Sequence, residues 1–246
     1  MDGRRRKMKA FGSYWAIGEP WGVAHPDHAC YSDESQVCYT DGVLQLGIGL
    51  RPAEHHGRQY LWAIGKVHSL QRVKYGIITA TFRLPLGRNL WPAIWLYDTE
   101  AWPPEIDILE GWSGQGFWPL LHRSDYLRLP WCHNIHPGLV HPAGLGGAYG
   151  SCGNKAVWRS QLNVHDLNRC RLTWTPDKIE VAYNGHTVMR ETRPDVLKAY
   201  NESNGMTIVL NNYVTRAFSY DDYNSLAQRT FTITDFSYTP YCYFYN

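Results

Sequence analysis

The chain lacks the features that mark membrane, disordered and nucleic-acid-binding proteins. Among its 246 residues no apolar run is long enough to span a membrane, and the basic start at residues 4–7 is not followed by a hydrophobic signal segment. Lysine and arginine number 24 against 22 acidic residues, and this near balance argues against nucleic acid as a partner. No linker, repeat or low-complexity tract divides the chain. We expect a disordered basic tail over residues 1–10 and a single, monomeric domain over residues 11–246, without nucleic-acid or membrane partners.

No two cysteines have the Cys-x-x-Cys spacing that is typical of structural zinc sites. The six cysteines occupy positions 30, 38, 132, 152, 170 and 242. Their even number is compatible with three disulfides, although free buried thiols are the alternative. We expect the pairs Cys30–Cys38 and Cys132–Cys152, because each would close one loop, and then Cys170–Cys242. Disulfides indicate an extracellular protein, even though no export signal is visible in the chain.

Helical periodicity is nearly absent, and short strand-like segments dominate. Asp41-Gly42 and Asn184-Gly185 predict hairpin turns, since these dipeptides accept positive φ angles at low cost. Further runs rich in β-branched and aromatic residues cover positions 75–84, 205–210 and 229–238. Only residues 193–200 suggest a short helix, which a proline could open. The predicted fold class is all-β, a jelly-roll β-sandwich of two antiparallel sheets whose concave face forms a groove.

Three carboxylates lie in one short segment that otherwise reads as a buried strand, Glu105-Ile-Asp-Ile-Leu-Glu110. An unpaired carboxylate on a buried face is costly unless a partner or a ligand compensates it. The acids are flanked by four tryptophans, namely Trp91, Trp95, Trp102 and Trp112. Because the apolar face of a sugar ring stacks on an indole while its hydroxyls bind polar groups, this pattern predicts a sugar-binding cleft with paired catalytic carboxyls. The alternative is that the tryptophans belong to the core.

Four segments, in order along the chain, resemble glycoside hydrolase family 16, and the likeness runs over most of the sequence. They are residues 75–96, 102–110, 172–185 and 233–238. The resemblance implies a retaining endo-glycoside hydrolase that acts on β-linked glucans or galactans. It assigns Glu105 as the nucleophile, Glu110 as the general acid and then the base, and Asp107 as the acid between them.

Strand geometry tests this assignment. Retention requires two carboxyl groups about 5–5.5 Å apart. In an unbroken strand, Glu105 and Asp107 share a face while Glu110 points to the other one. We therefore predict a β-bulge around Ile108-Leu109, which would turn Glu110 to the side of the other two acids.

The resemblance also implies further site residues. His136 lies where the family often places a histidine beyond the catalytic strand, although a lone histidine is often structural. Asn211 matches an asparagine whose amide could contact a sugar hydroxyl. The four flanking tryptophans are the stacking candidates. Catalysis requires no cofactor, and Asp235 matches an acid that holds one structural calcium in many members, which supports a calcium site only weakly.

The polymer is less well determined by the sequence. Trp91-Pro-Ala-Ile-Trp95 and Trp102-Pro-Pro-Glu105 are closer to the laminarinase branch than to agarases or carrageenases, so β-1,3-glucan or mixed β-1,3-1,4-glucan leads. A galactan such as agarose, porphyran or carrageenan is the alternative, and Arg123 and Arg128 could bind an anionic sugar or lie in solvent. The rival class is a lectin-like module on the same sandwich, which would bind sugar without cleaving it.

Overall fold

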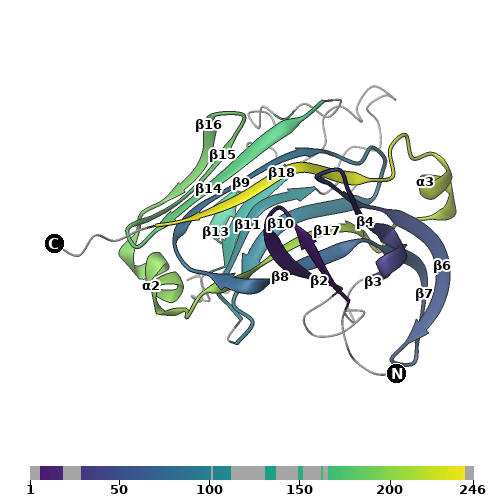
Figure 1. The fold of residues 1–246 in the computed structure, drawn as a ribbon, viewed down its shortest axis with the longest axis horizontal. Helices are drawn as coiled ribbons and strands as arrows, with labels where there is room; N and C mark the ends of the chain where they lie inside the picture. Colours follow the sequence, from purple (N-terminus) through teal and green to yellow (C-terminus); the bar gives the residue numbers. More distant parts are fainter. Residues whose placement is uncertain are drawn as a thin grey trace.

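Two large antiparallel sheets pack against each other in the computed structural model (Figure 1). The structure describes residues 6–18, 29–100, 102–111, 131–136, 149–151, 162 and 166–241. The eight-stranded sheet has the order β1 (Lys7–Ala10), β2 (Ser13–Ile17), β8 (Lys66–Val73), β17 (Met206–Val214), β10 (Leu90–Tyr97), β11 (Glu105–Gly111), β12 (Trp131–His136) and β13 (Tyr149–Ser151). The seven-stranded sheet has the order β16 (His186–Glu191), β15 (Lys178–Tyr183), β14 (Asn168–Thr175), β9 (Gly76–Arg83), β18 (Phe231–Pro240), β5 (Val43–Leu46) and β4 (Val37–Thr40).

The core lies between these sheets. Ile94 and Ile106 of the eight-stranded sheet meet Phe82 and Leu172 of the seven-stranded sheet in one cluster of fully or almost fully buried side chains. Each aliphatic or aromatic side chain that leaves water in this way contributes roughly 1.5–3 kcal/mol. Alternation along each strand sends one set of side chains into this core and the other set outward. The predicted fold class, a jelly-roll β-sandwich, is confirmed.

Both predicted hairpin turns are confirmed. Asp41 and Gly42 have φ angles of 52° and 78° between β4 and β5, and Asn184 and Gly185 have 47° and 88° between β15 and β16. Positive φ at both central residues is the geometry of a two-residue hairpin loop whose twist matches that of its strands. The predicted helix is also present as α2 (Pro194–Glu202), with proline in its first turn. Among the described residues, the other helices are the short η1 (Glu34–Gln36) and α3 (Tyr220–Asn224).

A third, smaller sheet was not predicted. It has the order β3 (Cys30–Ser32), β7 (Arg58–Ile64) and β6 (Ile48–His55), and its β3–β7 pair is parallel. The prediction of two purely antiparallel sheets is therefore incomplete. A parallel pair joins segments that are distant along the chain, and no local turn signal marks it.

Part of the expected basic tail is folded. Lys7–Ala10 is a strand that pairs with β2 through a turn at Phe11 and Gly12. Ala10 is buried and Met8 packs against the core, so this segment has an apolar side that an unfolded tail would leave in water. The expectation of disorder is wrong for residues 7–10, and residues 1–5 lie outside the described part. That residues 11–246 form a single domain stays a prediction.

Three cysteines, Cys30, Cys38 and Cys170, carry thiols and form no disulfide. Cys30 lies in the three-stranded sheet and Cys38 in the seven-stranded sheet, and they are not joined. Cys170 is fully buried in β14, where desolvation raises the pKa of its thiol to about 12. The predicted pairs Cys30–Cys38 and Cys170–Cys242 are therefore wrong. Cys170 serves instead as a small apolar core residue. The pair Cys132–Cys152 lies outside the described side chains. In the described part of the chain, no helix is long and apolar enough to cross a membrane.

Candidate active site

The predicted β-bulge is present in β11, the strand that carries the three acids. On one side β11 pairs with β10, where Ile94 lies opposite Leu109 and Trp95 lies opposite Asp107, so Ile108 is skipped. On its other side β11 pairs with β12, and the register shifts between Asp107 and Glu110. Two residues of β11 thus occupy the space of one on each neighbouring strand, which is the definition of a bulge.

The bulge brings the three acids to one face. Glu105, Asp107 and Glu110 lie opposite Tyr97, Trp95 and Ala93, respectively. Because these three partners are two residues apart on β10, they share one face, and residues opposite them point the same way. We call this side of the eight-stranded sheet, turned away from the core, the outer face.

The aliphatic residues between the acids point the other way. Ile106, Ile108 and Leu109 are fully buried in the core. Their packing anchors the strand, whereas Asp107 and Glu110 are 2% and 9% exposed on the outer face. Hydrophobic burial on one side thus fixes the direction in which the carboxylates point.

Each glutamate accepts a hydrogen bond from a tryptophan. The Nε1–H of Trp102 donates to Oε2 of Glu105 at 2.7 Å, and the Nε1–H of Trp91 donates to Oε1 of Glu110 at 3.1 Å. Trp102 is 63% exposed, so its ring is available for stacking while its N–H orients an acid. Both tryptophans thus contact the acids through hydrogen bonds that the sequence did not indicate, and their stacking on a sugar stays a prediction.

The third predicted tryptophan is held by Asn211. The Nε1–H of Trp95 donates to Oδ1 of Asn211 at 2.7 Å, and Nδ2 of Asn211 donates to the backbone carbonyl of Trp91 at 3.3 Å. Asn211 has no exposed surface, and its amide contacts the Trp95 indole and the backbone of Trp91. The expected contact of Asn211 with a sugar hydroxyl stays a prediction.

A buried lysine that the sequence analysis missed lies beside these aromatics. Lys66 has no exposed surface, and its Nζ donates to the Tyr213 hydroxyl at 2.5 Å. The ammonium also lies 5.2 Å from the centre of the Trp95 ring and 4.9 Å from that of Tyr213. Cation–π attraction and this hydrogen bond offset part of the cost of burying the charge. The signal was a single lysine in the otherwise apolar run of residues 60–67.

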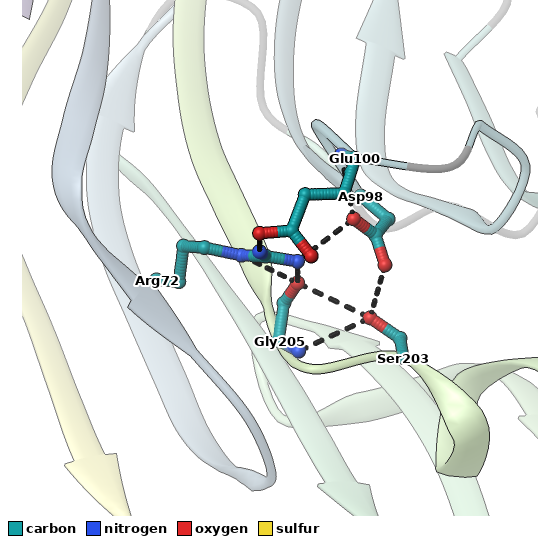
Figure 2. A network of polar contacts seen from close by, with 5 residues as sticks. All are labelled: Arg72, Asp98, Glu100, Ser203 and Gly205. Carbon is teal, nitrogen blue, oxygen red and sulfur yellow. Dashed lines mark hydrogen bonds and ion pairs between the residues drawn. The ribbon is translucent and has the colours of Figure 1, made fainter.

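A polar network supports the loop that leads into β11, and Figure 2 shows its five residues. Arg72 donates to Asp98 at 2.7 Å and to the carbonyl of Gly205, and it also pairs with Glu100. The Ser203 hydroxyl donates to the other carboxylate oxygen of Asp98 at 2.7 Å. Since Asp98 is only 4% exposed, these partners are what makes its buried charge tolerable.

The same loop closes on itself just before the first acid. The backbone N–H of Asp98 donates to the carbonyl of Pro104 at 3.1 Å. Trp102 lies inside this closed loop and Glu105 directly follows it. The network of Figure 2 thus holds Asp98, whose backbone N–H donates to Pro104, the residue directly before Glu105.

The remaining predicted residues have different outcomes. The backbone of His136 lies opposite Glu105 in the pairing of β11 with β12, which places it next to the acids, but its side chain lies outside the described part. Trp112 also lies outside it. Asp235 is exposed at a register shift of β18, and within the described residues no group of three or more His, Cys, Asp or Glu side chains gathers to hold a metal. The calcium site stays a prediction.

Comparisons with known proteins agree with this architecture. No family model matches the chain. The laminarinase catalytic domain of Thermotoga maritima has a TM-score of 0.65 at 17% identity, over 93% of this chain and 92% of that one. SCLam, a non-specific endo-β-1,3(4)-glucanase from family GH16, has a TM-score of 0.66 at 16% identity, over 91% of this chain and 83% of that one. The predicted resemblance to family 16 is thereby confirmed at the level of the fold.

A relative also appears by sequence. A galactan endo-β-1,3-galactanase of Flammulina velutipes is 24% identical over 124 residues, which cover 44% of this chain and 47% of that protein. The match thus spans about half the length of this relative.

Proposed function

We propose that the protein is a retaining endo-glycoside hydrolase that cleaves a β-1,3-linked polysaccharide. The observation that carries the proposal is the bulge, which turns Glu105, Asp107 and Glu110 to one face. A structural strand has no need of three carboxylates on one face, of which two are nearly buried. A double displacement needs two of them close together.

Each acid has one role in the proposed reaction. Glu105 attacks the anomeric carbon and forms a covalent glycosyl-enzyme, while Glu110 donates a proton to the leaving oxygen. Glu110 then removes a proton from water, which attacks the same carbon and releases Glu105. Asp107 lies between them, and its negative charge favours a state in which Glu110 keeps its proton.

The tryptophans orient and bind. The indole N–H of Trp102 donates to one oxygen of Glu105 and so orients the proposed nucleophile. Its exposed ring offers an apolar face to a sugar next to the cleaved bond. Trp91 donates to one oxygen of Glu110 and so orients the proposed proton donor.

The leading substrate is β-1,3-glucan or mixed β-1,3-1,4-glucan, which the likeness of the tryptophan segments to the laminarinase branch supports. A second candidate is a β-linked galactan, and the sequence match to an endo-β-1,3-galactanase favours it specifically. Polymers of either kind are too large to enter a cell, so we infer that the protein acts outside it. The described thiols give this inference no support.

The test is an assay of reducing ends with laminarin, lichenan, linear β-1,3-galactan, agarose and carrageenan. We expect cleavage of laminarin or the β-1,3-galactan, with the β-anomer as the first product in proton NMR. Glu105→Gln should abolish it, while Glu54→Gln, an exposed glutamate on β6, should leave it unchanged. Binding of a polymer without cleavage would favour the lectin-like module instead, and an α-anomer as first product would exclude retention.

A further inference from the structure

The backbone of the catalytic strand is held by two tyrosine hydroxyls that lie outside its own sheet. Tyr200, on α2, donates from its hydroxyl to the backbone carbonyl of Glu105 at 3.0 Å. Its side chain is fully buried. A helix that packs over the start of β11 thus fixes the peptide group of the proposed nucleophile.

The second hydroxyl reaches across the core. Tyr183 is the last residue of β15 in the seven-stranded sheet, and its hydroxyl donates to the carbonyl of Ile108 at 2.5 Å. Ile108 is the residue that β10 skips. Since a bulge takes its extra residue out of the regular ladder, a polar group there needs a partner from elsewhere.

The bulge sets the direction of the Glu110 side chain, so the hydrogen-bond partner of the Ile108 carbonyl affects the position of the proton donor. Without the Tyr183 hydroxyl, the carbonyl of Ile108 would lie in an apolar core, because Tyr183 and Ile108 are both 0% exposed. A buried carbonyl that loses its partner favours any rearrangement that finds another one. Such a rearrangement of the bulge would move Glu110.

We propose that Tyr183 and Tyr200 are positioning residues that set the two glutamates separately, Tyr200 for the nucleophile Glu105 and Tyr183 for the proton donor Glu110. Neither side chain touches the substrate. The proposal rests on the proposed hydrolase function and deepens it. It differs from a merely structural role because the two hydroxyls support different chemical tasks.

The two tasks can be separated by the leaving group. A phenyl glycoside needs a proton on its leaving oxygen, whereas 2,4-dinitrophenolate leaves without one. The quantity to compare is kcat/KM, which covers the steps up to formation of the glycosyl-enzyme. Phenyl and 2,4-dinitrophenyl β-laminaribiosides are the probes, or the β-1,3-galactobiosides if galactan is the polymer that the protein cuts.

Tyr183→Phe should lower kcat/KM for the phenyl glycoside about 10–100-fold, because a well-placed general acid contributes about 10²–10⁴-fold and a small displacement forfeits part of it. For the 2,4-dinitrophenyl glycoside the loss should stay within about threefold, since that step uses no acid. Tyr200→Phe should lower kcat/KM for both glycosides by similar factors, because both need the nucleophile.

The matched control is Tyr238→Phe. The Tyr238 hydroxyl also donates to a backbone carbonyl, that of Tyr75 at 2.8 Å, but on β18 of the seven-stranded sheet. Tyr238→Phe should leave kcat/KM unchanged for both glycosides. Equal losses on both glycosides with Tyr183→Phe, or no loss at all, would overturn the proposal.

Three further outcomes also decide the proposal. If Tyr183→Phe does not fold, para-aminophenylalanine at position 183 keeps the ring with a weaker donor, and its loss should again be confined to the phenyl glycoside; an equal loss on both would overturn the proposal. A wild-type protein that cleaves neither kind of glycoside nor any of the polymers overturns the proposed function and this proposal with it. A wild type that cleaves them while Tyr183→Phe shows no leaving-group dependence overturns this proposal alone.

Discussion

Deleting a residue from the bulge tests the placement of the acids by the parity of the strand. With Leu109 deleted, a single residue separates Asp107 from Glu110, and an unbroken strand then places both acids on the same face. Glu110 would stay opposite Ala93 and Asp107 opposite Trp95, with Ile108 opposite Ile94. Because both acids keep their face, we expect the deletion to retain at least about a tenth of the wild-type kcat/KM. A tenfold loss corresponds to about 1.4 kcal/mol of transition-state stabilisation.

The stability cost of this deletion can be estimated. Leu109 is fully buried, and the loss of such a side chain costs about 2–5 kcal/mol. In a chain of this size each kcal/mol lowers Tm by about 2–4 °C. Leu109→Ala, which keeps the bulge, is the matched control and should show a similar fall in Tm with activity retained.

Deleting both Ile108 and Leu109 should give the opposite result. Glu110 would then directly follow Asp107 and point to the other face, so activity should fall to that of Glu110→Gln. The assay is kcat/KM on the cleaved polymer, with circular dichroism to confirm folding. A folded single deletion without activity, or a folded double deletion with activity, would refute the reasoning.

Three other perturbations test the site and the scaffold. Trp102→Phe removes the N–H that donates to Glu105. Because a hydrogen bond to a charged group contributes about 1.5–3 kcal/mol, kcat/KM should fall about 10–100-fold, and an unchanged rate would contradict this. The Tm, read by calorimetry, should stay nearly constant since the ring is exposed. Asp98→Asn leaves Arg72 without its buried ionic partner, which should cost about 3–5 kcal/mol in urea unfolding; a loss below about 1 kcal/mol would mean that the network of Figure 2 does not support the loop. Asp222 is buried, which opposes ionisation, but hydrogen bonds from Asn89 and Ser219 outweigh this and lower its pKa below the usual value. Its ionised form therefore stabilises the fold above the unfolded-state pKa of about 3.9, and this contribution is lost as pH falls through the lower folded-state pKa. In a plot of unfolding free energy against pH, Asp222→Asn should make the fall at acidic pH less steep.

Local signals in the sequence were sufficient for much of the fold. Asp41-Gly42 and Asn184-Gly185 predicted two hairpins, because the conformational demand of a two-residue turn is met by the turn residues themselves. The bulge at Ile108-Leu109 followed from parity once the resemblance had assigned both glutamates to one task. These features depend on residues that are close together in the chain.

Features that depend on distant segments were missed. The parallel pairing of β3 with β7 and the hydroxyl of Tyr183 on Ile108 join residues far apart in sequence. No local pattern encodes such contacts, because they form only when the sheets pack. The predicted pairs Cys30–Cys38 and Cys170–Cys242 were wrong for a related reason. An even number of cysteines permits disulfides, but only the packing shows that Cys170 fills a place in the core.

The buried lysine shows what local reading could still have found. Lys66 stands in an apolar segment where a charge is costly. A charged residue in an apolar segment indicates that specific partners surround it, by the same reasoning that singled out the acids of β11. Its partners Tyr213 and Trp95 lie on two other strands of the same sheet, and the sequence does not order those strands.

The most direct test of the central claim is to trap the covalent intermediate. A 2,4-dinitrophenyl 2-deoxy-2-fluoro-β-glycoside of the disaccharide that the protein accepts should form a stable adduct, and peptide mass mapping should locate it on Glu105 alone. The adduct should be absent from Glu105→Gln and should still form in Glu110→Gln, because this leaving group needs no proton. An adduct on Asp107, Glu110 or any other carboxylate of an active protein would contradict the account.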